Sequence, residues 1–568
     1  MSEYGVKIRN YQAGSVFEYN NGVRSAYDFR DSMLTNSLFS YYLRDNGLNV
    51  SDGGSTRDII GINFDYGGQS YEMQVKRMKK LIKETENSDM SENKKSELIS
   101  KYNDIMEDVH KNKDKYIKRS AQKIREDYYQ YGVDIYYPTY HDNEPPQKIH
   151  YKMLYRTPGK GKKGSCMFIR EELYDIAREY LYMGIKLPEE NAPIVEIGAY
   201  SSLVTSTIVG TVEIDPRRIL ILKDVDSFFK TNVISVEVND NGHCIANRIN
   251  DYTLKNTLFD GQALIDLSIF PEWGDGYILL RQHFTKCAAF ATDIQQYFKD
   301  YFEDKYETAE LTDMWGNKIL AKDVLLITTD NAVKWCNKFG LSFDYWCEWV
   351  NKSKNIFGIV KTAHPSKIGN VQRMSYQMVN ALNVNTMDDV MKTSFEYIDS
   401  LKNDPECFLE FLKTNANFAN DYEVLYELVQ HNPEFANCDW FLRQKTWIIN
   451  KYIKKVKAGK LLQNGDNLVI TLNPYGMLMH AVGEDPEQDP TFENEDIAYQ
   501  CYTERFEDGA FLAEFRSPFN SQSSLGYLHN RLDERIRKYF RLGKLCIAIN
   551  GVHTAFQEKN NGLVEWLS

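Results

Sequence analysis

The sequence lacks paired cysteines, long apolar runs and a secretory leader. Its nine cysteines are scattered and form no C-x-x-C motif, which argues against a disulfide framework and against a zinc ribbon. No apolar run approaches the roughly 18–20 residues that a membrane span needs, and the N-terminal segment MSEYGVKIRN has no apolar stretch of the kind found in a secretory signal. We therefore expect a chain without a membrane partner, in a reducing compartment, with the cytoplasm as the default.

The motifs of common hydrolases and metalloenzymes are also missing. G-x-S-x-G, H-E-x-x-H and a His-Cys-Cys metal set do not occur, and the sequence has no Asp-x-Asp-x-Asp cluster. The last absence matters because two-metal phosphoryl transfer needs several carboxylates that converge on cations. TPGKGKKGSC (157–166) is rich in glycine and lysine, but its spacing does not match the G-x-x-x-x-G-K-[ST] phosphate-binding loop. We interpret it as a basic loop whose backbone can approach phosphates.

The composition is that of an ordinary globular protein with more than one domain. The chain has 568 residues, of which 42% are hydrophobic and 26% charged, so a disordered, collagen-like or coiled-coil chain is a poor description of the whole. At roughly 150 residues per domain, this length predicts three or four domains. Stretches with helical periodicity alternate with short β-type runs, and we therefore predict an α+β multidomain fold.

Changes of pattern along the chain predict five regions. Residues 71–130 carry mixed charges and a sparse apolar stripe, which predict two exposed helices with a turn near residues 87–92. PIVEIGAY (193–200) and GMLMHAV (476–482) are among the runs predicted as strands. The regions are an N-terminal mixed region with the helical arm (1–147), a basic loop and helix (148–192), a first β-barrel-like domain (193–350), a helical connector (351–460) and a partial second β-barrel (461–568).

Basic residues are concentrated in two stretches, although the net charge of the chain is −12. No acidic residue occurs between Glu144 and Glu171, nor between Asp439 and Asp466. A basic run is usually a solvated face, but two such runs in an acidic chain favour an anionic partner. We predict that they line a nucleic-acid path through sequence-independent phosphate contacts. The candidate residues are Arg156, Lys160, Lys162 and Lys163 in the first run and Lys454, Lys455 and Lys457 in the second.

Several segments in the second half of the chain follow motif patterns in a fixed order. LFDGQALID (258–266) has the pattern of a T-D-G-x-G strand turn. In LLRQHFTKCAAF (279–290), Arg281 and Lys286 have the spacing of Q-I-R-x-G-G-x-K-G, but its glycines are absent. TTDNAVKWCNKF (328–339) follows R-x-S-M-x-K-F and places Lys334 on its lysine. The next segment, HPSKIGNVQRMSYQMVNALNV (364–384), is similar to L-N-R-Q-x-I-x-L-L-x-x-L-G-V. It is followed by FLAEFRSPFNSQSSLGYL (511–528), which is similar to V-x-V-x-R-N-P-C-L-H-P-G-D-I. The last segment, LCIAINGVHTAFQEKNNG (545–562), is similar to the strand and loop before G-x-D-x-D-G-D.

In this order the segments resemble the RNA-silencing RNA-dependent RNA polymerases. These enzymes form a two-barrel (double-psi β-barrel) superfamily with the single-chain phage RNA polymerases, and the resemblance covers roughly residues 258–562. It implies nucleotidyl transfer that makes RNA on a nucleic-acid template from nucleoside triphosphates. Lys286 and Lys334 would contact the RNA 3′ end or the triphosphate, and Arg281 would position a phosphate. Arg516 would lie beside the template or the nucleotide.

The sequence departs from this family at the position of the metal ligands. Where the family continues with three aspartates that hold magnesium, this chain reads GLVEWLS (562–568). We therefore expect no metal ligands in the chain itself, and Mg²⁺ only if a partner or a downstream segment supplies the aspartates. The chain would be inactive alone or one piece of a split enzyme whose second polypeptide carries the metal site. The alternatives are a non-catalytic nucleic-acid-binding or scaffold protein and an unrelated multidomain protein.

Overall fold

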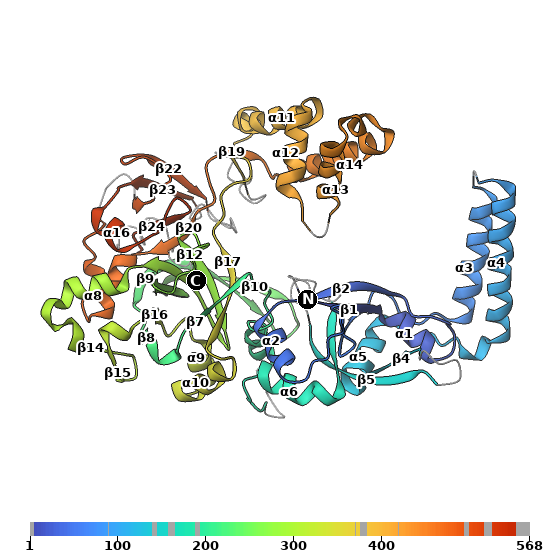
Figure 1. The fold of residues 1–568 in the computed structure, drawn as a ribbon, viewed down its shortest axis with the longest axis horizontal. Helices are drawn as coiled ribbons and strands as arrows, with labels where there is room; N and C mark the ends of the chain where they lie inside the picture. Colours follow the sequence, from blue (N-terminus) through green and yellow to red (C-terminus); the bar gives the residue numbers. More distant parts are fainter. Residues whose placement is uncertain are drawn as a thin grey trace. The chain divides into compact units, whose positions relative to one another are not determined.

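The computed structural model describes residues 5–88, 90–138, 145–156, 165–187, 194–369, 371–374, 383–417, 420–492, 499–515 and 525–551. The fold is mixed α+β with several curled sheets (Figure 1), as the sequence predicts at this level. The chain forms two compact units, each built from several segments. Unit 1 comprises Met1–Glu213, Arg281–Thr285 and Lys334–Val360, and unit 2 comprises Ile214–Leu280, Lys286–Val333 and Lys361–Ser568. No helix in the described ranges is long and apolar enough to cross a membrane.

Unit 1 contains a six-stranded sheet in the order β2-β1-β3-β6-β5-β4. Alternate side chains of β4 are buried, as in a strand with one covered face, whereas four successive residues of β6 are buried, as in a strand covered on both faces. Residues of α5 (Ala121–Tyr131) join the core of this sheet. The strands are β1 (Gly5–Gln12), β2 (Phe29–Thr35), β3 (Ile59–Asn63), β4 (Val133–Tyr137), β5 (Gln147–Arg156) and β6 (Cys166–Arg170).

The predicted helical arm is present in unit 1 as two helices that run side by side (Figure 1). They are α3 (Tyr71–Glu86) and α4 (Glu92–Lys111), and Ser70 caps the first by accepting the Met73 N–H at 3.4 Å. Few of their side chains are buried, so the helices expose most of their charged surface. The prediction of two exposed helices with a turn near residues 87–92 is confirmed for residues 71–111, whereas α5 adds a third helix to the predicted region and contributes to the core.

Five neighbouring strands of a seven-stranded sheet follow the order β8-β16-β11-β13-β12, and we call them the first sheet of unit 2. β8 pairs parallel with β16, β16 antiparallel with β11, and β11 parallel with β13. Only two residues join β12 to β13, and the Ala291 N–H donates to the Gly276 carbonyl at 3.0 Å, so this pair is an antiparallel hairpin. The strands are β8 (Ile219–Leu222), β11 (Gln262–Asp266), β12 (Tyr277–Gln282), β13 (Thr285–Thr292) and β16 (Leu326–Thr329).

A second sheet of unit 2 has the order β20-β24-β21-β23-β22. β20 pairs parallel with β24, β24 antiparallel with β21, β21 parallel with β23, and β23 antiparallel with β22. Its strands are β20 (Val469–Leu472), β21 (Tyr499–Tyr502), β22 (Phe511–Phe515), β23 (Leu525–Asn530) and β24 (Cys546–Ile549).

The five strands of the first sheet repeat the topology of the second sheet. If these five strands and the five strands of the second sheet are each numbered along the chain, both series read 1-5-2-4-3, with the same sequence of parallel and antiparallel pairs. Only the pair 4-3 joins strands that are consecutive in the chain, whereas consecutive strands are usually neighbours. Recurrence of such a non-sequential order therefore points to two copies of one structural unit.

Helices fill the later part of the predicted helical connector (351–460), whereas Ile356–Thr362 and Val371–Arg373 in its first part are the strands β17 and β18. The helices are α11 (Met387–Asn403), α12 (Pro405–Asn415), α13 (Tyr422–His431) and α14 (Asp439–Lys457). Asp404 caps α12, where Pro405 occupies the first turn, a position that needs no backbone N–H. The four helices enclose a core of their own, which includes Leu401, Phe408 and Ile448.

Two segments predicted as strands are helices. PIVEIGAY lies largely in α7 (Ile194–Ser201), because a short apolar run has no period that separates a helix from a strand. Most of GMLMHAV lies in α15 (Pro474–Ala481), which begins at Asn473 with Pro474 in its first turn. Asn followed by Pro is a helix-start signal, and it outweighs the β-type composition of the run.

Candidate functional site

The three residues proposed for catalysis are located on strands and at a helix start. Arg281 lies in β12 and is half-buried, Lys286 lies in β13 and is exposed, and half-buried Lys334 begins α9 (Lys334–Phe339). The Lys286 N–H donates to the Ala332 carbonyl at 3.1 Å, and the Lys334 N–H donates to the Phe284 carbonyl at 2.8 Å. The backbone of both lysines is therefore fixed by hydrogen bonds, and their joint role stays a prediction.

Phe284, between Arg281 and Lys286, has an unusual backbone conformation. Its φ angle is +49°, in the left-handed region that favours glycine, although its side chain is buried. A residue held there costs of order 1–3 kcal/mol, and such strain concentrates at functional sites. In the Arg-x-Gly-Gly-x-Lys pattern, Phe284 occupies the position of the second glycine.

Acidic side chains meet at the ends of strands 1 and 5 of the first sheet. Asp224, two residues after β8, is buried, and its carboxylate accepts hydrogen bonds from the Phe259 N–H at 2.9 Å and the Thr329 hydroxyl at 2.6 Å. Burial raises the pKa of Asp224, and these hydrogen bonds oppose that shift. Asp330, directly after β16, forms an ion pair with Lys223, directly after β8.

The second sheet has a polar junction at the same place. Asn473 directly follows β20 and Asn550 directly follows β24, so they correspond to Lys223 and Asp330 of the first sheet. The Asn473 side-chain amide donates to Asn550 Oδ1 at 3.4 Å, and the Gly551 N–H donates to Asn473 Oδ1 at 2.7 Å. Each sheet thus links its strands 1 and 5 through a pair of side chains at equivalent positions.

Gln262 connects the two sheets within unit 2. It is the first residue of β11, is buried, and donates from Nε2 to the Leu472 carbonyl of β20 at 2.8 Å. Its Oε1 accepts from the Leu472 N–H at 2.8 Å and from the Thr471 hydroxyl at 2.9 Å. The motif LFDGQALID therefore supplies the side chain that satisfies the edge of the other sheet.

The first basic run is largely neutralised in its described part. Lys148 pairs with Asp134 at 2.9 Å, Lys152 with Glu171 at 2.8 Å, and Arg170 with Asp58 at 3.2 Å. These carboxylates lie outside the basic run in the sequence but next to it in space. A run without acidic residues therefore does not form a surface without acidic groups. The backbone of Arg156 lies in β5. Lys160, Lys162, Lys163 and Arg516 lie outside the described residues.

The second basic run keeps its charge. Lys454, Lys455 and Lys457 are exposed on α14, and within the described ranges none of them forms an ion pair with a carboxylate. Although Lys455 is exposed overall, partial desolvation of its amine lowers its pKa, and the nearby charges of Arg373, Lys451 and Lys460 lower it further. We name Arg373, Lys451, Lys455 and Lys460 the cation cluster of the connector.

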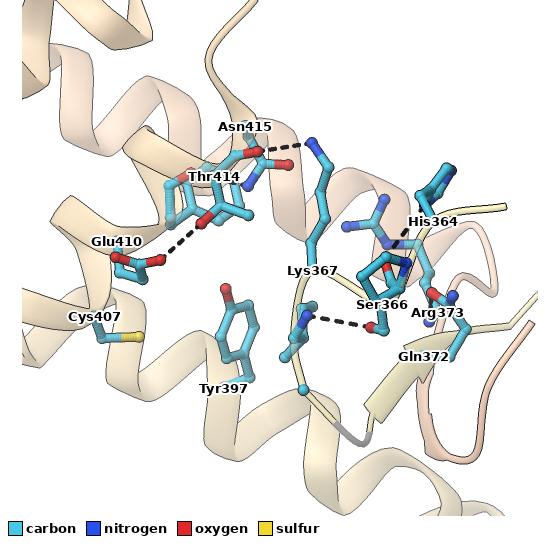
Figure 2. A pocket seen from close by; sticks show the side chains of 14 residues that line it. His364, Ser366, Lys367, Gln372, Arg373, Tyr397, Cys407, Glu410, Thr414 and Asn415 are labelled. Carbon is cyan, nitrogen blue, oxygen red and sulfur yellow. Dashed lines mark hydrogen bonds between the residues drawn. The ribbon is translucent and has the colours of Figure 1, made fainter. Parts of the chain in front are cut away.

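A cavity of about 390 Å³ adjoins the cation cluster. Figure 2 shows Lys367 and Arg373 entering it from the segment before α11, opposite Tyr397 and Glu410 of the helices. Lys367 Nζ donates to the Thr414 carbonyl at 2.7 Å, whereas the buried Nε of Arg373 has no hydrogen-bond partner in the part of the chain that the structure describes. The cavity is thus lined by cations and by one carboxylate, and of these groups the guanidinium and ammonium are the ones that bind phosphate oxygens.

Lys367 and Arg373 were not predicted individually, although both lie in the segment HPSKIGNVQRMSYQMVNALNV. No local pattern identifies them, because their charge matters only beside α14, which comes later in the chain. The described residues contain no group of three His, Cys, Asp or Glu side chains placed to hold a metal. Asp224 and Asp330 are already engaged by hydrogen-bond donors and by Lys223, so they do not fit the magnesium site of the resembled family.

No protein-family model matches the chain, and no curated protein matches its sequence. The functional argument therefore rests on the geometry of the chain itself.

Proposed function

We propose that this chain is part of a two-barrel RNA polymerase that makes RNA on a nucleic-acid template, and that the two sheets of unit 2 are its barrels. The shared 1-5-2-4-3 order of these sheets is the single observation that carries the proposal. A two-barrel enzyme needs two copies of one strand arrangement in a single chain, with a helical connector between them, and unit 2 has this layout.

Arg281, Lys286 and Lys334 supply the basic groups in this proposal. Phosphoryl transfer depends on positioning and on neutralising the charge of the phosphates, so lysines near the reacting groups act without covalent chemistry. Lys286 and Lys334 contact the RNA 3′ end or the triphosphate, and Arg281 positions a phosphate. The left-handed backbone at Phe284 supports this assignment, since the family motif has glycine there.

Magnesium enters the proposal only with ligands from elsewhere. The described residues offer no suitable carboxylate set, so a second polypeptide or residues outside the described ranges would hold the ion. When bound, Mg²⁺ would neutralise phosphate charge during nucleotidyl transfer. The residues of this chain would bind and orient the RNA end, the template and the nucleoside triphosphate.

Chemical labelling of the two lysines tests the proposal without requiring catalysis. Periodate oxidation converts the terminal ribose of an RNA primer to a dialdehyde; a nearby lysine amine condenses with it, releasing water, and borohydride reduces the imine to a stable amine. With a template-annealed primer, we expect mass spectrometry to find the label chiefly on Lys286 and Lys334. Lys286→Gln and Lys334→Gln should each lose their own label while the circular dichroism spectrum is unchanged.

The comparison lysines are Lys76 and Lys79, which are exposed on α3. Equal labelling of these residues and of Lys286 and Lys334 would contradict the polymerase proposal. Unlabelled nucleoside triphosphate should reduce labelling at Lys286 and Lys334 but not on α3.

A second candidate function is nucleic-acid binding without catalysis. The cation cluster of the connector favours it, because grouped cations attract the phosphates of nucleic acid whether or not unit 2 is a polymerase. Salt-sensitive binding of nucleic acid together with no preferential labelling of Lys286 or Lys334 would select this function.

A further inference from the structure

One face of α14 exposes two tryptophans among basic residues. The exposed fractions of Trp440 and Trp447 are 45% and 56%. Lys451 Nζ lies 5.0 Å from the ring centroid of Trp447, and exposed Lys454 follows one turn later. With 3.6 residues per turn, positions 440, 447, 451 and 454 fall on the same side of the helix.

The opposite face of α14 anchors the helix in the connector. Phe441, Ile448, Ile449, Tyr452 and Val456 are all buried, and they belong to the core of the four-helix connector. The helix therefore has its apolar stripe already, and the two exposed tryptophans are additional to it. Trp440 also contacts Phe435 of the connector, with ring centroids 5.8 Å apart, but both tryptophans keep about half of their surface exposed, which indicates a binding role.

The charges around the tryptophans select the type of partner. Within the described residues, no carboxylate pairs with Lys451 or Lys454, and Arg443 bonds only to the Asp439 carbonyl, at 3.2 Å. Protein–protein interfaces are depleted in lysine. A membrane-binding helix would insert its apolar face, but that face of α14 is occupied by the connector core.

We propose that this face of α14 binds single-stranded nucleic acid, with Trp440 and Trp447 stacking on bases and Lys451 and Lys454 contacting phosphates. Sequence-independent single-strand binding combines aromatic platforms with a basic track in this way. Positions 440 and 447 are separated by a helix rise of about 10 Å, the length of roughly three base steps. A single strand can place its bases on such rings, whereas a duplex keeps its bases stacked inside.

The inference deepens the proposed function by naming a strand-binding surface, but its evidence is separate. It would stand for a non-catalytic nucleic-acid-binding protein as well. Labelling of Lys286 and Lys334 does not involve Trp447, so either proposal can fail while the other holds.

Binding of labelled oligonucleotides to the full chain tests the proposal. Fluorescein-labelled oligo(dT) and oligo(U) of about 12 nucleotides would be titrated with protein and followed by anisotropy. We expect Trp447→Ala and Trp440→Ala to weaken binding roughly 5- to 150-fold each, the loss of one stacked base. Trp447→Phe keeps an aromatic ring, so its affinity for the oligonucleotides should remain close to that of the unchanged protein.

Two matched controls separate stacking and charge from general effects. Trp273→Ala removes an exposed tryptophan that lies outside α14 and should leave the affinity unchanged. Lys451→Ala combined with Lys454→Ala should reduce the slope of log K against log salt by about 1.4, since single strands give about 0.7 per phosphate contact. Lys76→Ala combined with Lys79→Ala on α3 should not change the slope.

The following outcomes would overturn the proposal. One is that neither oligonucleotide binds at low salt. Another is that the Trp447→Ala variant binds the oligonucleotides as tightly as the Trp273→Ala variant does. Duplex DNA binds better than either oligonucleotide, with no effect of the tryptophans, which would assign the face to duplex phosphates alone. Binding to phosphatidylserine vesicles without binding to oligonucleotides would assign it to a membrane surface.

Discussion

His283 shows how burial can set the charge of a single residue. The ring lies fully buried in unit 1, with its centroid 4.4 Å from that of Tyr180 and 5.8 Å from that of Trp349. Burial lowers the pKa of His283 to about 3, although a hydrogen bond to the Tyr180 carbonyl at 3.1 Å raises it. With Phe284, His283 replaces the two glycines of the resembled motif, so this turn is held by packed rings as well as by backbone hydrogen bonds.

We expect acid to destabilise unit 1 through His283. Its folded-state pKa lies below the ordinary value of 6.5, so the unfolded chain takes up the proton first. Stability that is present above pH 6.5 should fall as the pH drops toward 3, by up to about 1.4 kcal/mol per pH unit. Urea unfolding followed by tryptophan fluorescence measures this slope. In the His283→Gln variant, the free energy of unfolding should change less with pH between about pH 6.5 and 5. An unchanged slope would show that other groups cause the pH dependence.

β9 (Asp226–Val238) and β10 (Cys244–Thr257) form an exposed two-stranded ribbon. Among the described strands they pair only with each other, in antiparallel register. Ile234, Val236 and Val238 lie on one face and expose 71%, 64% and 68% of their surface. β-Branched side chains favour the strand conformation without a core, but an apolar ribbon with open edges also promotes association.

Polar substitutions in the ribbon should change association without changing stability. We expect Ile234→Thr combined with Val236→Thr to alter the free energy of unfolding by no more than about 0.5 kcal/mol, because both side chains are exposed. Light scattering should show less self-association than for the unchanged chain. Ile265→Thr places the same hydroxyl in buried β11 and should cost about 1–3 kcal/mol. A comparable loss from the ribbon substitutions would mean that the ribbon is packed in solution.

At the scale of the whole molecule, the repeated 1-5-2-4-3 order is the main feature of unit 2, and Gln262 is the residue that couples its two copies. One side-chain amide satisfies both the N–H and the carbonyl of Leu472 and also accepts from Thr471. Since a buried backbone group without a partner costs free energy, the two sheets are most stable when they are held together.

Gln262→Ala should therefore weaken the coupling between the sheets. It leaves two buried groups of Leu472 without partners, at about 1–3 kcal/mol each, so we expect a loss of about 2–6 kcal/mol. Calorimetry should show that the thermal unfolding transition of unit 2 becomes broader or splits into two transitions. Gln296→Ala, which removes an exposed hydrogen bond to Asp300 on α8 (Ile294–Phe302), should cost less than about 0.5 kcal/mol. Equal losses for the two variants would argue against a coupling role for Gln262.

Local features of the sequence determined many elements of this protein. The helices α3, α4 and α11–α14 follow from apolar spacing and from caps such as Ser70 and Asp404, because a helix is decided by residues three or four positions apart. The long strands β9 and β10 follow from β-branched composition. Where a short apolar run has no usable period, as in α7 and α15, the pattern predicted the wrong element.

Only the tertiary structure decided which distant residues meet. The order 1-5-2-4-3 is set by burial and pairing between segments far apart in the chain, and no local period encodes it. The same holds for charge: carboxylates from other segments neutralise Lys148 and Lys152, while Arg373 joins Lys455 more than eighty residues after it in the chain. Electrostatic interactions depend on distance in space, so a basic run becomes a basic surface only after the chain has folded.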